Sequence, residues 1–228
     1  MRALALAFVL TAVLLAGCGS SKNAAPANDE ASKPAAQVLT DAKSAATQAS
    51  SAHVVGSIKS SGAPITIDLS TARNKGAKGS MSTNGLSFDL VRIGDTIYIR
   101  GSDAFLKRFA GAAAAQLLHG KWLKASATRG RLRSLAPLTS LAALFGGITT
   151  HHGKLVNDGK STHKGQPVVV IRDTSDNSKL YVAAAGKPYP VALVGSKKQP
   201  GTITFGDWNK SVSLSPPSGA IDISKFGG

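Results

Sequence analysis

The sequence has little of what stabilises small exported domains or spans membranes. It contains one cysteine in 228 residues, so no intramolecular disulfide can form. Aromatic residues make up only 5% of the chain. After the first 18 residues the longest apolar stretch is FAGAAAAQLL at 109–118, which contains Gln116 and is shorter than the about 20 residues of a membrane helix. These absences argue against a disulfide-stabilised domain and against a polytopic membrane protein.

The sequence also lacks the motifs of common enzyme classes. It has no HExxH zinc motif, no GxSxG nucleophile elbow and no phosphate-binding loop. Of the five histidines, only His151 and His152 are neighbours, and neighbouring side chains of an extended segment point to opposite faces. The single glutamate is Glu30. We therefore expect no catalytic residues, no metal ligands and no cofactor.

The N-terminus carries an export signal. Arg2 precedes an apolar run over 3–14, and small residues follow. Leu15-Ala16-Gly17-Cys18 matches the bacterial lipobox, in which the cysteine receives a diacylglycerol and cleavage occurs just before it. We predict a signal peptide over 1–17 and a lipid anchor on Cys18, because two acyl chains suffice for stable attachment to a membrane. The alternative is that Cys18 is an ordinary small residue of the signal peptide. The anchor would place the protein on the outer, extracytoplasmic face of the cell membrane.

The remainder divides into a tether and one domain. Residues 18–34 are rich in Ser, Ala, Asn and Pro and predict a flexible tether, and 35–228 have the length of a single domain. The chain has 27 basic and 12 acidic residues, a net charge of +15, which attracts polyanions. Outside a bacterial membrane these are lipid head groups and wall polymers, so no nucleic acid partner is expected. The alternative is a solvated basic surface without a specific partner.

Apolar periodicity predicts few helices and many strands. Helices are expected over 34–52, 102–120 and 137–147, and strands over 65–69, 86–90, 95–100, 166–173, 179–184, 189–195, 201–208 and 211–215. Short turns such as Gly94-Asp95 separate neighbouring strands, as in an antiparallel meander. The predicted class is α+β, with a curved antiparallel sheet and the helices gathered on one side.

Two of these helices carry apolar stripes. In the helix over 102–120, Phe105, Phe109, Ala113 and Leu117 recur every four residues, and Gly111 is a weak point. The second stripe recurs every three residues and comprises Leu132, Leu135, Leu138, Leu141 and Leu144. We expect Gly146-Gly147 to end the helix that carries it and to act as its hinge.

The layout resembles the actinobacterial LppX/LprA/LprF/LprG lipoproteins over roughly residues 35–225. The resemblance rests on the export signal, on a meander ending DTIYIR, on a helical insertion closing in GKWLK, and on KGQPVVVI, LYVAAAGKPYPVAL and GTITFGDW. It implies a half-barrel similar to the carriers LolA and LolB, with helices covering the concave face and enclosing an apolar cavity. Relatives in that family bind acylated lipids or glycolipids and help to move them across the envelope.

The resemblance gives the apolar residues a candidate role. The expected cavity lining is Phe88, Leu90, Ile97, Ile99, Phe105, Phe109, Leu117, Leu138, Leu141, Leu144, Ile203 and Phe205. The alternative is that these residues form an ordinary packed core. The leading functional prediction is a lipid or glycolipid carrier with the membrane, the lipid and a membrane transporter as partners. The alternative is a ligand-free envelope lipoprotein that binds wall polymers or partner proteins through its basic surface.

Overall fold

A computed structural model describes residues 25–60, 63–149 and 152–223 of the chain. Within these ranges the strands form one sheet in the order β12-β6-β5-β4-β3-β2-β1-β11-β10-β9-β8-β7. The first strands are β1 (Ser51–Ser60), β2 (Ala63–Ala72), β3 (Gly76–Thr83), β4 (Leu86–Ile93), β5 (Thr96–Gly101) and β6 (Leu123–Ser126). The others are β7 (Leu155–His163), β8 (Gln166–Asp173), β9 (Lys179–Ala183), β10 (Pro190–Val194), β11 (Gly201–Gly206) and β12 (Ile221–Asp222). The helices are η1 (Glu30–Ser32), α1 (Ala35–Gln48), α2 (Asp103–Ala110), α3 (Ala112–Leu118), η2 (Arg131–Thr139) and α4 (Leu141–Thr149).

Two meanders build the sheet. Strands β1 to β6 pair antiparallel in sequence order, and β7 to β11 do the same. The meanders join where β1 pairs with β11, with Val54 opposite Phe205. Tight two-residue turns set the register, as at Asn84-Gly85 between β3 and β4, where both residues have positive φ as a twist-matched hairpin turn requires.

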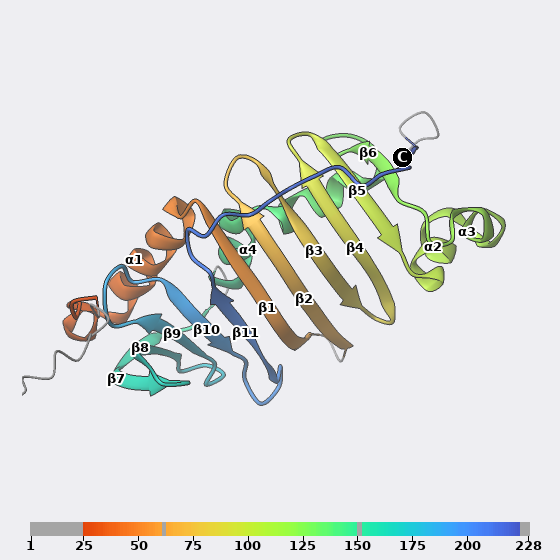
Figure 1. Ribbon diagram of the computed structural model, residues 1–228. Coiled ribbons are helices and arrows are strands. Elements are labelled where there is room, and N and C mark those ends of the chain that lie inside the picture. Colours follow the sequence, from red (N-terminus) through yellow and green to blue (C-terminus); the bar gives the residue numbers. More distant parts are fainter. Residues whose placement is uncertain (1–24, 61–62, 150–151, 224–228) are drawn as a thin grey trace, which may run out of the picture.

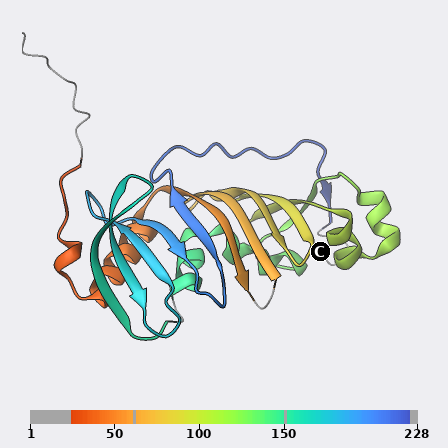
Figure 2. The same ribbon diagram turned by 90° about the horizontal axis from the view of Figure 1, so that it is seen from below.

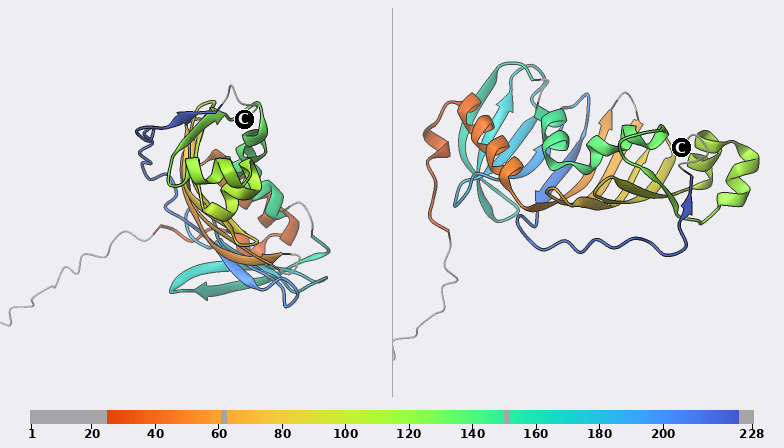
Figure 3. Two further views of the ribbon diagram at one scale, coloured as in Figure 1. Left: turned by 90° about the vertical axis from the view of Figure 1, so that its right-hand side faces the viewer. Right: turned by 90° about the horizontal axis from the view of Figure 1, so that it is seen from above.

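The sheet is long and strongly curved, and the helices α1, η2 and α4 lie along its concave face (Figures 1 and 3). The pair α2–α3 projects from one end, beyond β4 and β5, whereas α1 lies at the other end near β7 to β10 (Figure 1). The chain after β11 crosses the outer face, opposite the helices, and reaches β12 beside β6 (Figures 2 and 3). The predicted class is thus confirmed: an α+β half-barrel with helices over its concave face.

Several predicted element bounds are wrong for identifiable reasons. The helix expected over 102–120 is divided at Gly111, whose φ of 89° lies outside the helical region. The helix expected over 137–147 begins only at Leu141, because Pro137 lies inside the preceding η2. Gly146-Gly147 do not end α4, which continues to Thr149.

The strand expected over 211–215 is absent from the sheet within the described residues. After Asn209 bonds to the carbonyl of Ser51, the next backbone hydrogen bond from this segment to the sheet comes from Ile221, which donates to Trp122. The intervening chain runs across the outer face instead of along a strand edge (Figure 2). Its alternating sequence therefore has no partner strand to pair with.

Residues 25–34, the described part of the segment expected to be a tether, pack against the folded domain. Ala27 bridges Ala185, and the Asn28 amide donates to the carbonyls of Ala183 and Gly186. Glu30, placed in the tether by its neighbours in sequence, is only 2% exposed. The prediction of a flexible tether to residue 34 is therefore wrong for 25–34, because polar side chains of this segment find partners on the folded domain.

An ion cluster fixes this segment to α1. The Lys33 ammonium lies 2.7 Å from Glu30 Oε1, 2.9 Å from Asp41 Oδ2 and 3.0 Å from Asp29 Oδ1. Hydrogen bonding with Glu30 and then Asp41 raises the pKa of Lys33, and the same ammonium lowers the pKa of Asp41. Asn157 adds hydrogen bonds from its amide to the carbonyls of Glu30, Ala31 and Lys33. The folded domain therefore includes residues 25–34.

Candidate functional site

The concave face of the sheet is apolar from end to end. Inward side chains alternate with outward ones along each strand, so a strand contributes every second residue to the interior. On β4 and β5 these are Phe88, Leu90, Ile97 and Ile99, each at most 8% exposed. One continuous cluster joins them to Val54, Leu69, Leu123, Val169, Ile171, Leu180, Val182, Ile203 and Phe205.

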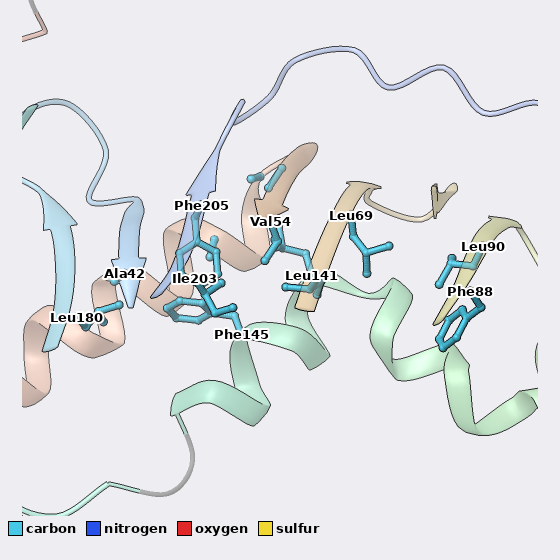
Figure 4. Packing of buried hydrophobic residues seen from close by; sticks show 14 of the residues in the cluster. Ala42, Val54, Leu69, Phe88, Leu90, Leu141, Phe145, Leu180, Ile203 and Phe205 are labelled. Atoms are coloured by element: carbon cyan, nitrogen blue, oxygen red, sulfur yellow. The ribbon is translucent and has the colours of Figure 1, made fainter. Parts of the chain in front are cut away.

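Short helices, and no second sheet, cover this face. From α1 the buried residues are Ala35, Val38, Ala42 and Ala46, spaced by three or four as on one helical face. The helix α4 contributes Leu141 and Phe145, which are 7% and 0% exposed. The Phe145 ring lies edge-on to Phe205, with ring centroids 5.7 Å apart, and Figure 4 shows it beneath Ile203 and Phe205. Phe145 is therefore the side chain by which α4 fills the middle of the interior.

The chain on either side of α4 is fixed by polar contacts. Before the helix, Arg92 on β4 donates to the Thr139 hydroxyl at 3.0 Å. After it, the Asp173 carboxylate accepts the Gly153 N–H at 2.7 Å and the Ser175 N–H at 2.8 Å. Burial raises the pKa of Asp173, but the hydrogen bonds from Ser175 and Gly153 outweigh burial, so the pKa lies below its ordinary value. Polar contacts at Thr139 and at Gly153 thus hold the chain before and after α4.

Most residues expected to line a cavity lie together in this interior. Phe88, Leu90, Ile97, Ile99, Leu141, Ile203 and Phe205 are buried, and Phe105, Phe109 and Leu144 are half-buried against them. The Phe105 ring is 5.1 Å from Phe88 and 5.6 Å from Phe109, so α2 covers the β4 and β5 end. Whether the cluster opens into a cavity stays a prediction.

Three expected site residues stand apart. Leu117 is 79% exposed, because the break at Gly111 turns α3 so that its Leu117 face points to solvent. The expectation that Leu117 lines the interior is therefore wrong. The side chain of Leu138 and the lipid-attachment residue Cys18 lie outside what the structure describes.

The most important residue that the sequence reasoning missed is Phe145. It follows Leu141 by four residues, which is the spacing of one helical face. The prediction used the three-residue spacing of the leucines, and that spacing does not include Phe145. Val54 was missed because β1, which reads SAHVVGSIKS, mixes polar residues and glycine with its apolar positions. An analysis of four-residue spacing from Leu141 would have found Phe145.

A cleft of about 460 Å³ lies at the edge of the sheet where strands turn, beside the start of α4. Its walls are the end of α1, the β2–β3 and β4–β5 turns, and the start of α4, where Leu141 and Ala142 lie. Arg73, Lys75 and Arg92 line it, with Asp95 as the acidic residue. The cleft therefore combines a positively charged rim with a side chain of the apolar cluster.

A larger cleft of about 680 Å³ is open, and Met81 and Phe88 line it together with polar residues. Its charged residues are paired: Arg100 donates to Asp89 at 2.8 Å, and His119 lies 2.6 Å from Asp103. The Arg100 guanidinium also lies over the Trp122 ring, 4.9 Å from its centroid. The charged side chains that line this larger cleft therefore already have partners within the protein.

The titratable groups form pairs typical of a protein surface. His53 Nε2 lies 2.7 Å from Asp68, and no hydrogen bond joins His53 or His119 to a serine hydroxyl in the described part of the chain. Over the described ranges, no three histidine, aspartate, glutamate or cysteine side chains gather as metal ligands would. None of the described helices has the length and apolar character needed to cross a bilayer.

Comparison with solved structures supports the fold. LprF from Mycobacterium bovis superimposes with a TM-score of 0.53 at 16% identity, over 81% of this chain and 97% of LprF. The chain has the fold of LprF. The Mycobacterium tuberculosis lipoprotein LppX aligns over 79% of this chain and 99% of its own, with a TM-score of 0.48 and 17% identity. No protein-family model and no curated protein matches the sequence.

The likeness to LprF confirms at the level of fold the resemblance that the sequence motifs indicated. Both the extent, 81% of this chain, and the half-barrel with covering helices agree with the expectation. At 16% identity the likeness concerns the backbone arrangement. The function therefore has to be argued from the interior and its charged cleft.

Proposed function

We propose that this protein is a membrane-anchored, exported lipoprotein that holds the acyl chains of a lipid or glycolipid beneath α4 and helps to carry them across the cell envelope. It acts without catalysis. The diacylglycerol on Cys18 keeps it at the outer face of the cell membrane. A membrane transporter is the partner that would load or unload it.

One observation carries the proposal. The sheet curves around an apolar face but does not close, and short helices cover that face in place of a second sheet (Figure 3). A helix of nine residues can be displaced with less loss of hydrogen bonding than a strand, because its backbone hydrogen bonds are internal. Displacement of α4 withdraws Phe145 and opens the space between Leu69 and Phe205 (Figure 4).

The charged cleft supports the same reading. Acyl chains beneath α4 would place the lipid head group in the cleft that Leu141 lines together with Arg73 and Lys75. Guanidinium and ammonium groups bind phosphate and carboxylate oxygens through charge-assisted hydrogen bonds. We therefore expect anionic lipids to bind in preference to neutral ones.

Native mass spectrometry of the mature chain, residues 18–228, followed by organic extraction tests the proposal. The expected result is added mass that resolves into acyl lipids. Phe145→Trp, which enlarges the side chain filling the interior, should reduce bound lipid, whereas Ala143→Trp on the exposed face of α4 should not. A chain that stays lipid-free after incubation with extracted host lipids would refute the carrier function.

The alternative is a ligand-free envelope lipoprotein that binds wall polymers or partner proteins through its basic surface. The complete burial of Phe145, which is 0% exposed, favours it, because the ring already occupies space beneath α4. Salt-sensitive binding to wall polymers by lipid-free protein, together with a negative lipid extraction, would support this alternative over the carrier.

A further inference from the structure

The helices α2 and α3 form a hairpin at the end of the sheet opposite α1 (Figures 1 and 2). Leu106 of α2 is 0% exposed and Ala115 of α3 is 3% exposed, so both helices are packed on the core cluster. The Ser102 hydroxyl caps α2 by accepting the Phe105 N–H. The hairpin is thus a fixed part of the fold.

The outer surface of α3 is apolar although it faces solvent. Ala112, Ala113, Gln116 and Leu117 are exposed, and Ala113 and Leu117 share one face at a spacing of four. Leu117 is 79% exposed, and the next most exposed large apolar residue of the described chain is Ile221 at 38%. Leu117 thus exposes most of an apolar side chain on an element that is itself packed on the core cluster.

The same hairpin carries three exposed cations. Lys107 and Arg108 lie on the exposed side of α2, Lys121 follows α3, and none of the three forms an ion pair with a described residue. The nearest acid on the hairpin, Asp103, is 2.6 Å from His119 and so already has a partner. The hairpin therefore combines an exposed leucine with three cations that form no ion pair with a described residue.

We propose that the end of this hairpin is a membrane-docking surface for an anionic phospholipid bilayer. Leu117 and Ala113 enter the interface between head groups and acyl chains, and Lys107, Arg108 and Lys121 contact lipid phosphates. Interfacial elements bind bilayers through this combination of buried apolar area and attraction to anionic lipids.

The position of the hairpin determines the orientation of the protein. The described chain begins at Ala25 beside α1, at the far end from α2 and α3 (Figure 2). Ala25 lies seven positions after Cys18, an extended reach of about 25 Å. With the proposed acyl anchor at one end and the hairpin at the other, the long axis of the sheet lies along the bilayer.

Vesicle binding tests the docking surface without the anchor. The mature chain 18–228 with Cys18→Ser keeps every described element and has no acylation site. Its partition is measured into vesicles of phosphatidylcholine alone and of phosphatidylcholine with 30% phosphatidylglycerol. We expect binding to the anionic vesicles, and Leu117→Ser to weaken it roughly tenfold, from the value of burying most of a leucine. Gln116→Ser, on the same exposed face, is the matched control and should leave binding unchanged.

The charge component has its own matched control. Lys107→Gln with Arg108→Gln should weaken binding roughly 25-fold, at about 1 kcal/mol for each cation near an anionic surface. Lys197→Gln with Lys198→Gln removes the same charge from the exposed turn between β10 and β11 and should weaken binding less than about threefold. Unchanged melting temperatures would show that all variants are folded.

Three outcomes would overturn the docking surface. The first is no binding to anionic vesicles. The second is equal loss from the two paired-charge variants, which would mean that only net charge matters. The third is full binding by Leu117→Ser with loss in the Lys107/Arg108 variant, which would identify a site for soluble polyanions and not a bilayer contact. None of these outcomes depends on whether a lipid occupies the interior beneath α4.

Discussion

Replacing Phe145 by alanine tests how α4 is held on the sheet. The ring is 0% exposed and packs edge-on against Phe205 at 5.7 Å. Truncation of a buried phenylalanine costs about 3–5 kcal/mol, and the aromatic pair accounts for about 0.5–1.5 kcal/mol of such packing. For a domain of this size each kcal/mol lowers the melting temperature by about 2–4 °C, so a decrease of roughly 6–20 °C is expected.

Urea unfolding of the Phe145→Ala, Phe205→Ala and double variants would measure both quantities. The single variant gives the loss of the free energy of unfolding, and the double-mutant cycle gives the coupling between the rings. Ile99→Ala is a control, because Ile99 is equally buried but lies on β5, away from α4. Its loss should be about 2–5 kcal/mol, with no coupling to Phe205.

A loss below about 1 kcal/mol for Phe145→Ala, with a normal loss for Ile99→Ala, would contradict the packing described for α4. A coupling of zero between Phe145 and Phe205 would refute the ring contact even if each single variant were destabilised. If a lipid fills the space that Phe145 leaves, adding that lipid should restore part of the lost stability in Phe145→Ala and not in Ile99→Ala.

Two further predictions concern the sheet. The Arg172 guanidinium donates to both oxygens of Asp158 and holds the pKa of that carboxyl below its ordinary value. The pair therefore stabilises the fold fully at pH values above the unfolded pKa of about 3.9. This contribution is lost as the pH falls through the folded pKa. Asp158→Asn should therefore lower the urea midpoint at pH 7, and the difference from the parent should shrink as the pH falls below about 3.9. An unchanged difference over that range would exclude the ion pair as the cause. Gly56→Ala should prevent β1 from pairing with β11, because the added Cβ would lie 2.0 Å from the Thr202 carbonyl oxygen at a φ of 149°; a folded variant with native circular dichroism would contradict that register.

Where the sequence predicted the fold correctly, a local signal was strong. The strand β8 has the bounds expected over 166–173, because a run of β-branched residues is delimited by Gly165 and by the Thr174-Ser175-Asp176-Asn177 turn. By contrast, β1 has Gly56 and alternating small residues, and its inward side is recognisable only once β11 lies beside it. Its assignment depended on a contact between residues about 150 positions apart.

The sequence predicted that one face of the sheet is apolar, but it did not predict which helix side chains pack against that face. Alternation identified Phe88, Leu90, Ile97 and Ile99 because a strand directs every second side chain inward. The orientation of Leu117 depended on the φ of Gly111, which the sequence permits but does not require. The burial of Glu30 depended on Lys33, Asp41 and Asn157 meeting in space.

The sheet has two terminal strands, and an unpaired strand edge is a template on which a second chain can add. At one end, the crossing C-terminal segment places β12 against β6 and occupies part of that edge. At the other, the outermost strand β7 is distorted between Asn157 and Gly159, and Lys160 follows. Copies held by the proposed lipid anchor would be confined to two dimensions and would meet often. The edges of this open half-barrel oppose growth into a shared sheet, so such copies could be crowded on a surface without polymerising.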